Sequence, residues 1–457
     1  MSFFKAYDMR GTFGVDFTPE VVHQIGRALP RVVGDGKWLV GRDCRASSPE
    51  VHDALVKGLL EAGVEVVDLG LCTTPMVYFY TAKKGFDGSV MITASHNPPS
   101  DNGLKVSKKT ALPVGYADGL DQVEEMVKRG VCCEGAKGKN AAVSFEGLAR
   151  YIEWQKKNGP ILNAGSGLKY AVDCSNGMSS LLVHELFPGA VVINDTLDGN
   201  FPCHAPNPLM AKAREQIAKV VREKGLDLGI IFDGDADRCM FVDERGDFVQ
   251  PDYLIALVVK ATMKRVGKGT GADEKVKVIH DVRTSRGAIE AMREMGCETV
   301  MVPVGHAFAK PILRECGALC GGELAGHYYF SEFFGCDSGV LAALRILSEV
   351  AAAKAEGKSF SELMAPIAGR YTNSGELNFR VEDKDAAIQR VLRVAAEKLP
   401  REIGREEMDG IRIEYADGWL NVRKSNTEPY LRLIVECKGA ERLKEWVALL
   451  EGAIREG

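Results

Sequence analysis

The chain has 457 residues, a formal net charge of −5 at pH 7, 46% hydrophobic residues and 26% charged residues. At about 100–200 residues per domain, this length predicts three or four domains. The acidic balance disfavours a nucleic-acid partner, which usually requires a basic surface. No apolar run approaches the ~18 residues needed to span a bilayer, and residues 1–6 lack the pattern of a secretory signal. We therefore expect neither a nucleic-acid nor a membrane partner.

The 12 cysteines form no recognisable framework. Cys132 and Cys133 are adjacent, Cys316 and Cys320 are four residues apart, and no C-x-x-C pattern occurs, which disfavours a zinc site. Scattered cysteines in a large chain are typical of buried thiols in a reducing compartment. We therefore expect the protein to be cytoplasmic.

Short apolar runs alternate with helical patterns over the first two-thirds of the chain, which is typical of α/β units around a mostly parallel sheet. Thr18-Pro19-Glu20 and Ser48-Pro49-Glu50 each predict a helix start, because a capping hydroxyl is followed by proline. The apolar residues of 210–223 fall on one helical face. The predicted strands are Lys37–Val40, Val64–Leu69, Ser89–Thr93, Tyr170–Asp173, Leu228–Phe232, Val276–His280 and Thr299–Pro303.

The last part of the chain shows consecutive strand-like runs, followed by a closing helix around residues 443–450. This order predicts an α+β domain with an antiparallel sheet. The predicted strands are Glu376–Arg380, Ile411–Glu414, Trp419–Arg423 and Leu431–Glu436. We place the four domains at 1–145, 146–251, 252–368 and 369–457.

The segment Thr93-Ala94-Ser95-His96-Asn97-Pro98-Pro99 directly follows the predicted strand Ser89–Thr93. Open α/β sheets bind ligands just beyond the carboxyl ends of their strands, and Asn-Pro-Pro favours a turn there. A serine hydroxyl in this place can act as a nucleophile or carry a phosphate. Taken alone, the segment fits an ordinary polar turn equally well.

The segment Asp233-Gly234-Asp235-Ala236-Asp237-Arg238 follows the predicted strand Leu228–Phe232. Its three carboxylates would repel one another if unpaired, and all-oxygen ligands favour Mg²⁺, Ca²⁺ or Mn²⁺. An EF-hand loop would also use these aspartates and Glu244, but its sixth position requires glycine and here holds Arg238. The strand before the loop disfavours both an EF-hand and a solvated acidic loop.

Two later loops concentrate polar groups. Arg423-Lys424-Ser425-Asn426-Thr427-Glu428-Pro429 lies between two predicted strands and has the composition of a phosphate cradle. Gly321-Gly322-Glu323-Leu324-Ala325-Gly326-His327 brackets a carboxylate and an imidazole that suit sugar hydroxyls. A polar hairpin loop and a structural histidine are the alternatives. Lys5–Gly11 and Gly41–Arg45 also place cations among turn residues, and Lys105 lies ten residues past Ser95. Gly305-His306 follows a predicted strand and begins a helix that carries Lys310. Each of these is a weak signal alone.

Together and in this order, the four motifs make the chain resemble the α-D-phosphohexomutase superfamily of phosphoglucomutases and phosphomannomutases. The resemblance runs from Phe4-Lys5-Ala6-Tyr7-Asp8-Met9-Arg10-Gly11 to the Arg423–Pro429 loop, nearly the whole chain. It implies three related α/β domains with mixed sheets around a cleft. It also implies a smaller C-terminal α+β domain that resembles the TATA-binding-protein fold.

The resemblance further implies roles for individual residues. Ser95 would carry a phosphate and hold Mg²⁺ together with Asp233, Asp235 and Asp237. The other expected catalytic residues are Arg10, Lys105, Arg238 and His306. The expected substrate-binding residues are His96, Lys310, Glu323, Ala325, His327, Arg423, Ser425, Asn426, Thr427 and Arg432.

The implied reaction interconverts the 1- and 6-phosphates of mannose, glucose or both, through phospho-Ser95 and a hexose 1,6-bisphosphate. Mg²⁺ and glucose 1,6-bisphosphate are the expected cofactors, and phosphosugars are the expected partners of a monomer or weak homodimer. Lys105 and His306 are both candidates for the general base, and a lysine base would need a depressed pKa.

The loop at residues 321–327, here called the sugar loop, departs from the family pattern. Members that use both glucose and mannose phosphates often carry Gly-Glu-Met-Ser-Gly-His, where this chain has Leu324 and Ala325 in place of Met-Ser. Ala325 cannot donate the hydrogen bond of a serine, so the preferred hexose stays open. The loop lacks the glutamine-containing pattern common in phosphoglucosamine mutases, which disfavours that substrate.

Two other functions compete with the mutase hypothesis. A metal-dependent phosphatase would need no second phosphate site, so the Arg423–Pro429 loop disfavours it. A non-catalytic phosphosugar binder would need neither Ser95 nor the three aspartates.

Overall fold

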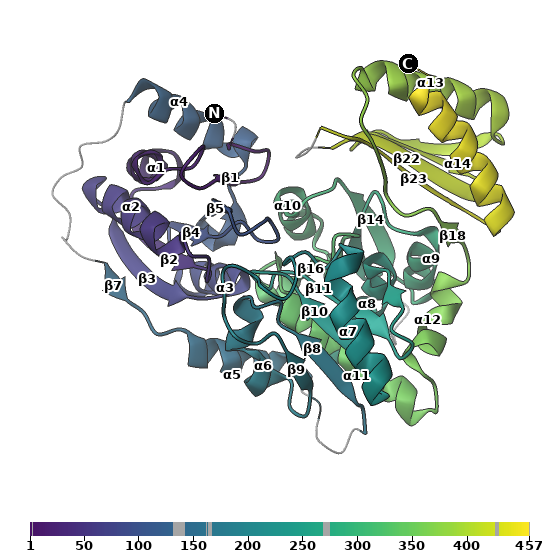
Figure 1. Cartoon of the computed structure of the whole chain (residues 1–457), viewed down its shortest axis with the longest axis horizontal. Coiled ribbons are helices and arrows are strands. Elements are labelled where there is room, and N and C mark those ends of the chain that lie inside the picture. Colours follow the sequence, from purple (N-terminus) through teal and green to yellow (C-terminus); the bar gives the residue numbers. More distant parts are fainter. Residues whose placement is uncertain are drawn as a thin grey trace.

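The computed structural model describes residues 1, 3–130, 142–160, 162, 167–267, 275–425 and 429–456. Within these residues the strands form four sheets, which follow one another along the chain from purple to yellow in Figure 1. None of the helices described is long and apolar enough to cross a membrane.

The first sheet has seven strands in the order β1-β5-β4-β2-β3-β7, with β6 paired to β5. Strand β2 is parallel to β3 and β4, whereas β5 is antiparallel to both β4 and β1. The elements of this region are β1 (Met9–Thr12), α1 (Pro19–Val33), β2 (Lys37–Arg42), α2 (Ser48–Glu61), β3 (Glu65–Leu71), α3 (Thr74–Lys84), β4 (Gly88–Ile92), β5 (Asp101–Lys108), β6 (Leu112–Pro113), α4 (Leu120–Arg129) and β7 (Val143–Ser144).

The second and third sheets have five strands each, in the orders β12-β11-β10-β8-β9 and β14-β13-β15-β16-β17. The second region contains α5 (Leu148–Asn158), β8 (Tyr170–Asp173), α6 (Val183–Leu186), β9 (Val191–Ile193), α7 (Ala211–Lys224), β10 (Leu228–Phe232), β11 (Cys239–Asp243) and β12 (Phe248–Val249). The third contains α8 (Pro251–Val266), β13 (Lys277–Asp281), α9 (Arg286–Glu294), β14 (Glu298–Val302), α10 (His306–Cys316), β15 (Cys320–Gly322), β16 (Tyr328–Phe330), β17 (Cys336–Asp337), α11 (Gly339–Ala355) and α12 (Phe360–Ala368).

One four-strand pattern recurs in these three sheets. A central strand (β2, β8 or β13) is parallel to both its neighbours, and one neighbour (β4, β10 or β15) forms an antiparallel hairpin with the next strand (β5, β11 or β16). The prediction of three related α/β domains with mixed sheets is thereby confirmed. Ser95, Asp233 and Glu323 lie in the three equivalent hairpins.

Local signals account for most of these elements. All strands predicted in this part of the chain are present, each within two residues of its predicted ends. Thr18 caps α1 by accepting a hydrogen bond from Val21 N, as its sequence predicts. The cap of α2 is Ser47 rather than Ser48, and its side chain makes no capping hydrogen bond. The antiparallel strands β5, β11 and β16 were not predicted, because their pairing depends on the preceding strand rather than on their own pattern.

Helix α3 joins the first three regions into one core. A helix that is buried on all sides is expected at such a central place, and the residues of α3 from Thr74 to Thr81 are all buried. The ring of Phe79 lies 5.4 Å from that of Trp154 and 6.0 Å from that of Phe333. A single hydrophobic cluster therefore contains residues from all three sheets.

The fourth region is an α+β unit with its own core, seen at the upper right of Figure 1. Its sheet is antiparallel throughout, in the order β18-β23-β22-β21-β20 with β19 also paired to β23, which confirms the predicted class. Its elements are β18 (Thr372–Asn373), β19 (Leu377–Phe379), α13 (Lys384–Lys398), β20 (Glu402–Glu406), β21 (Ile411–Tyr415), β22 (Gly418–Lys424), β23 (Leu431–Cys437) and α14 (Ala440–Arg455).

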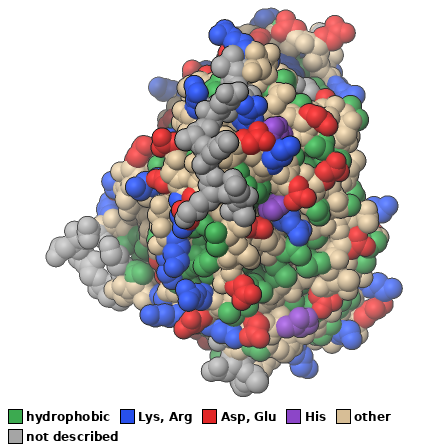
Figure 2. Space-filling view, turned by 90° about the vertical axis from the view of Figure 1, so that its left-hand side faces the viewer, with side chains coloured by type: hydrophobic (Ala, Val, Ile, Leu, Met, Phe, Trp, Pro, Cys, Tyr) green, Lys and Arg blue, Asp and Glu red, His purple; other side chains and the backbone are tan. Residues whose placement is uncertain are grey.

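The surface carries charges of both signs. On the face drawn in Figure 2, acidic and basic side chains are interspersed rather than gathered into one field. This mixture agrees with the composition of 58 Lys and Arg against 63 Asp and Glu.

Candidate active site

Ser95 lies at the carboxyl end of β4, in the hairpin that leads to β5. Its backbone is left-handed, with φ of 52°, and the residue is 1% exposed. Ser95 N donates to the Thr93 hydroxyl at 2.9 Å, and Ser95 Oγ donates to Asp233 Oδ2 at 3.1 Å. His96 Nδ1 lies 3.4 Å from the same hydroxyl. The turn therefore directs the serine hydroxyl toward the acidic loop of the second region.

The absence of a side chain at Gly234 allows this close approach. A Cβ at position 234 would lie 2.6 Å from the Ser95 carbonyl oxygen, closer than any real contact. A larger residue would therefore separate the acidic loop from Ser95.

Asp233, Asp235 and Asp237 form a buried cluster whose ligand oxygens all lie within 4.8 Å of one another. Lys105 Nζ donates to Oδ2 of both Asp235 and Asp237 at 2.6 Å, and Thr74 also donates to Asp235. Asp235 Oδ1 and Asp237 Oδ1 are buried and accept no hydrogen bond from the described residues. Buried carboxylate oxygens without a donor favour a cation, so these residues fit Mg²⁺.

The charges of the cluster shift its pKa values in opposite directions. Burial, together with the charges of Asp237 and Asp235, holds the pKa of Asp233 well above its ordinary value. Burial would also raise the pKa of Asp237, but the charges of Lys105 and His327 outweigh it and lower that pKa. The negative charge of the loop therefore lies on Asp237, beside Lys105 and His327, more than on Asp233.

The two candidates for the general base differ in their pKa values. Burial would lower the pKa of Lys105, but Asp235 and Asp237 outweigh it and raise that pKa. Burial and the charge of Lys310 hold the pKa of His306 well below its ordinary value, so its imidazole is neutral. A depressed pKa makes the imidazole a weak base and a raised pKa keeps the ammonium protonated, so neither shift by itself identifies the general base, and both residues stay candidates.

Two arginines lie beside Ser95 and the aspartates. Arg10 donates from Nε and Nη2 to Asp8 Oδ2 at 2.9 and 2.7 Å, and from Nη1 to the Ala94 carbonyl at 3.4 Å. Arg238 N donates to Asp233 Oδ1 at 3.1 Å, and its Nε lies 3.7 Å from Asp233 Oδ2. The structure thus brings together Ser95, the three aspartates, Arg10, Lys105 and Arg238.

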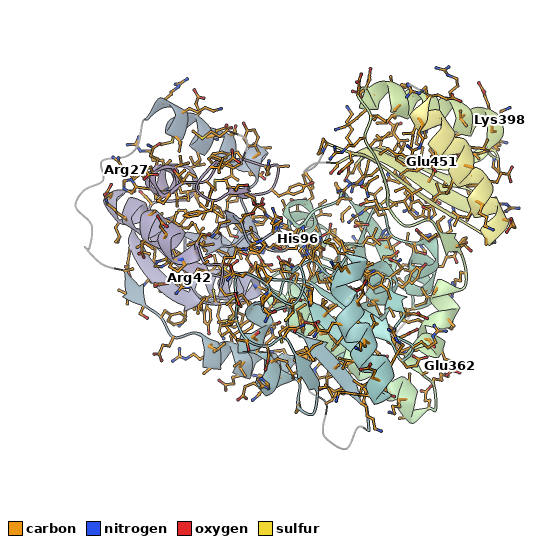
Figure 3. All side chains as sticks on the ribbon, in the orientation of Figure 1. Arg27, Arg42, His96, Glu362, Lys398 and Glu451 are labelled. Atoms are coloured by element: carbon orange, nitrogen blue, oxygen red, sulfur yellow. The ribbon has the colours of Figure 1, made fainter. Side chains whose placement is uncertain are left out.

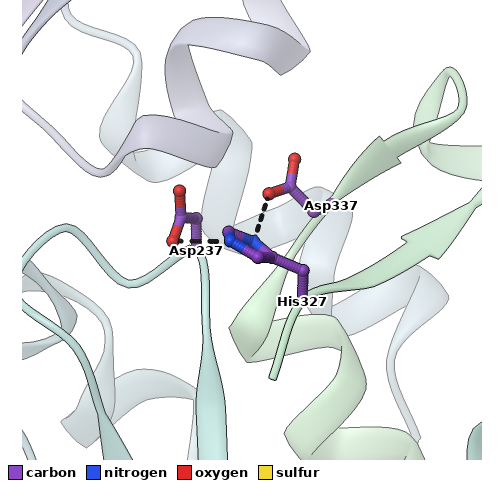
Figure 4. Close-up of side chains that lie close together, drawn as sticks. All are labelled: Asp237, His327 and Asp337. Carbon is purple, nitrogen blue, oxygen red and sulfur yellow. Dashed lines mark hydrogen bonds and ion pairs between the residues drawn. The ribbon is translucent and has the colours of Figure 1, made fainter. Parts of the chain in front are cut away.

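His327 lies between two carboxylates, as Figure 4 shows. Its Nδ1 is 2.8 Å from Asp337 Oδ2 and 3.8 Å from Asp237 Oδ1. Lys310 is fully buried, with Nζ 2.7 Å from Asp337 Oδ1 and 3.5 Å from the centroid of the Tyr78 ring. Lys310 therefore pairs with Asp337 beside His327, and its predicted contact with substrate stays a prediction.

Glu323 and Ala325 occupy the hairpin that follows β15. Glu323 is 1% exposed, and its two oxygens accept hydrogen bonds from Gly305 N and Tyr329 OH, both at 2.6 Å. Ala325 is half-buried. A sugar contact with Glu323 would require one of these oxygens to accept a second hydrogen bond, and both predicted roles stay predictions.

Three arginines converge on Glu376 at the joint between the third and fourth regions. Their nearest nitrogens lie 3.0 Å (Arg423), 3.1 Å (Arg432) and 3.7 Å (Arg283) from its carboxylate. Burial would raise the pKa of Glu376, but the three guanidinium groups outweigh it and lower that pKa. The residues around Glu376 therefore form a second cationic centre, here called the arginine cluster (Arg283, Arg423 and Arg432).

The sugar loop connects the arginine cluster with the Ser95 side of the site. Leu324 N donates to Asp281 Oδ2 at 3.1 Å, and Arg283 Nε donates to the same oxygen at 3.0 Å.

In the predicted phosphate cradle, Ser425 N donates to the Tyr430 carbonyl at 2.9 Å. Asn426 and Thr427, the other predicted members of the cradle, lie outside the described residues.

The two parts of the site come from different regions of the molecule. His96, next to Ser95, lies near the middle of the view in Figure 3, whereas Lys398 and Glu451 belong to the fourth region at the upper right. The sequence alone assigned no role to Thr74, Arg283 or Asp337, although the first two follow a recognisable signal. Thr74-Pro75 is a helix start, and Asp281-Val282-Arg283 repeats the spacing of Asp43-Cys44-Arg45.

Comparisons with known proteins agree over nearly the whole chain. Four phosphoglucomutase/phosphomannomutase family models match in order: alpha/beta/alpha domain I at residues 1–130, domain II at 149–246, domain III at 250–371 and the C-terminal domain at 376–452.

Similar sequences and structures extend this agreement. A protein named "Phosphohexose mutases" of Xanthomonas campestris is 35% identical over 452 residues, which cover 97% of this chain and 96% of that protein. A phosphomannomutase of Escherichia coli is 34% identical over 465 residues, 98% of this chain and 99% of that protein. The crystal structure of a phosphoglucomutase/phosphomannomutase family protein from Burkholderia thailandensis has a TM-score of 0.87 at 29% identity, and the match covers 99% of this chain and 97% of that one.

Proposed function

The chain belongs to the phosphoglucomutase/phosphomannomutase family, and from this premise we propose that it is an enzyme that interconverts hexose 1-phosphates and hexose 6-phosphates. Its substrate is a phosphate of mannose, glucose or both. The observation that carries this proposal is the presence of two groups of cations. Arg10, Lys105 and Arg238 lie beside Ser95, and the arginine cluster lies beside Glu376. The sugar loop connects the two groups. A sugar that exchanges phosphate at both ends needs two such centres, whereas a phosphatase needs one.

In the proposed reaction Ser95 carries the phosphate. A free hydroxyl of the bound hexose phosphate attacks phosphorus, the bond from phosphorus to Ser95 Oγ breaks, and a hexose 1,6-bisphosphate forms. The hydroxyl proton passes to a general base, for which Lys105 and His306 are the candidates. After the bisphosphate turns end for end, the freed Ser95 Oγ attacks the other phosphorus, the bond from that phosphorus to the sugar oxygen breaks, and this sugar oxygen takes up the proton held by the base.

The charged residues stabilise the transferring group. Arg10, Lys105 and Arg238 face the position of the phosphate on Ser95 and offset its charge as the bond to oxygen changes. Asp233, Asp235 and Asp237 would hold Mg²⁺, which supplies further charge neutralisation at the phosphate.

The arginine cluster and the loop at 423–429 would bind the phosphate that does not react. This cradle must accept a phosphate from either end of the hexose, so we propose that it recognises the phosphate group more than the ring. Charge-assisted hydrogen bonds from arginine suit that role.

A phosphorus-31 NMR time course tests the proposal. The protein with Mg²⁺ and a trace of glucose 1,6-bisphosphate receives glucose 1-phosphate or mannose 1-phosphate, and we expect the 6-phosphate signal to grow without inorganic phosphate. The relative rates identify the preferred hexose. Release of inorganic phosphate would favour a phosphatase, and an unchanged spectrum with both sugars would overturn the proposal for these substrates.

A Ser95→Ala variant separates the enzyme from a binder. We expect it to lose at least about 1,000-fold in turnover, because the proposed nucleophile is gone. Hexose phosphate binding, measured by calorimetry, should remain. The requirement for glucose 1,6-bisphosphate, the monomeric or weakly dimeric state and the cytoplasmic location stay predictions.

A further inference from the structure

We propose that Arg45 is a positioning residue for phosphoryl transfer, because its buried guanidinium holds the main chain of the serine loop, residues 95–101, in the conformation that directs Ser95 Oγ at Asp233. This inference rests on the proposed role of Ser95 as the phosphate carrier. Arg45 acts through the main chain, since its side chain donates to neither the Ser95 hydroxyl nor Asp233.

The guanidinium of Arg45 uses all five of its N–H groups. Arg45 is 1% exposed, and its Nε donates to Asp43 Oδ2 at 3.1 Å. A guanidinium holds its five donors in one rigid plane, whereas a lysine ammonium offers three that rotate together. The remaining four donors bind the carbonyl oxygens of one loop, at 2.9 Å (Ser95), 2.8 Å (Asn97), 2.6 Å (Pro98) and 3.0 Å (Asp101).

Arg45 is itself held from both sides. Asp43 Oδ1 accepts hydrogen bonds from Arg45 N at 3.0 Å and from Ser48 Oγ at 2.5 Å, which fixes the carboxylate that orients the guanidinium. From the second region, the Phe201 ring lies 5.1 Å from Arg45 Cζ, and a Cβ on Gly199 would lie 2.3 Å from Arg45 Cα. Such close packing excludes water and strengthens the five hydrogen bonds.

These contacts explain how the left-handed conformation of Ser95 persists. A residue other than glycine in this conformation is strained and needs surroundings that over-determine it. The Ser95 carbonyl is bound by Arg45 on one side, and Gly234 approaches the same oxygen on the other. Loss of the guanidinium would release the loop and with it the direction of the hydroxyl.

The chain contains a matched control for this role. Asp43-Cys44-Arg45 and Asp243-Glu244-Arg245 form the same local ring, in which Arg N donates to Asp Oδ1 at 3.0 Å in both. The Nε to Oδ2 distances are also alike, at 3.1 and 3.2 Å. The Arg245 side chain, however, is 62% exposed and donates to no carbonyl of the serine loop. The Asp-x-Arg ring is therefore a feature of the local turn. The hydrogen bonds to the four loop carbonyls are made by Arg45 and not by Arg245.

The test compares Arg45→Lys with Arg245→Lys by steady-state kinetics, normalised to the phosphoserine content measured by intact mass. We expect Arg45→Lys to lose roughly 100-fold in kcat with KM within about twofold, since the bound sugar is unaffected but the serine is misplaced. Slower phosphorylation of Arg45→Lys by glucose 1,6-bisphosphate would support the proposal in the same way. Arg245→Lys should match the wild type within about twofold in both constants.

Chemical rescue provides a second readout that loss of folding would not produce. Free guanidinium at millimolar concentration should raise the kcat of Arg45→Ala, and the increase should level off as the concentration rises. Methylammonium at the same ionic strength should not raise it. An Arg45→Lys variant with wild-type kcat per phosphoserine would overturn the inference, and so would an equal loss in Arg245→Lys. Failure of the wild type itself to interconvert hexose phosphates would instead overturn the proposed function.

Discussion

Lys105 shows how single buried charges are balanced at this site. Its ammonium bridges Asp235 and Asp237, and all three side chains are almost entirely removed from solvent. Removal of one partner from such a group leaves an uncompensated buried charge, which costs about 3–5 kcal/mol.

Replacement of Lys105 by methionine should therefore lower the free energy of unfolding by about 3 kcal/mol in the presence of a chelator. Millimolar Mg²⁺ should restore part of the loss, because a divalent cation can neutralise the buried carboxylates that have lost Lys105. Urea unfolding with and without Mg²⁺ measures both effects. Lys219→Met is the control, because the side chain of Lys219 is 68% exposed. Equal stability of Lys105→Met and the wild type in chelator would contradict this account.

Asp252, in the first turn of α8, connects stability to pH. Asp252 Oδ2 accepts a hydrogen bond from Ser285 N at 2.8 Å, and burial raises the pKa of the carboxyl to about 7, with Glu436 and Asp281 adding to the effect. The native state therefore keeps this proton up to about pH 7, whereas an unfolded aspartate loses it near pH 4. Between these values the native state binds more protons, so its stability falls as pH rises.

Asp252→Asn removes this titration while it keeps an acceptor for Ser285 N. We expect the stability of the variant relative to the wild type to increase between about pH 4 and pH 7, by at most about 4 kcal/mol, and to stay constant above that range. Urea unfolding at intervals of one pH unit measures the difference. A difference that does not change with pH would show that Asp252 is ionised in the native state throughout.

At the scale of elements, α3 is the helix that unites the first three regions. Phe79 is fully buried and contacts aromatic rings from two other regions. Phe79→Ala should lower the free energy of unfolding by about 3–5 kcal/mol, because it leaves a cavity that rigid neighbours cannot fill. Urea unfolding followed by circular dichroism measures the loss, with Val15→Ala as control, since Val15 is 74% exposed. A loss no larger than that of the control would show that the three regions do not depend on this contact.

At the scale of the whole molecule, the fourth region is held to the third by polar contacts rather than by a shared core. Arg286, at the start of α9, donates to the carbonyls of Tyr415 and Gly418 at 2.9 and 2.8 Å and also to Glu414. Such a joint permits the fourth region to move as a unit when substrate binds. The position of the cradle relative to Ser95 would then depend on this joint.

Arg286→Ala should raise KM for hexose phosphate by about tenfold and change kcat less, because the cradle loses its fixed position before substrate binds. Steady-state kinetics measures the two constants. Arg293→Ala is the control on the same helix, since its Nε donates to Thr299 within the third region. Equal constants for Arg286→Ala and the wild type would show that the joint does not affect binding.

The family, the strands of the parallel cores and the loops that carry the chemistry could all be predicted from the amino-acid sequence. Hydrophobic periodicity and turn residues act over a few positions, so the strand ends before Ser95 and Asp233 could be located without a structure. The direction of a side chain is less local. The sequence predicts both Lys105 and Lys310 as cations near the site. In the structure Lys105 bridges Asp235 and Asp237, whereas Lys310 is buried against Asp337.

Which polar groups contact one another became known from the folded chain. Arg45 looked like a cation in a turn, and its four carbonyl partners come from a loop about 50 residues later, brought beside it by the pairing of β2 with β4. Thr74, Arg283 and Asp337 likewise gain their roles from other segments. The reason is physical: local pattern limits the conformation of a segment, whereas the partners of a buried polar group depend on how distant segments pack around it.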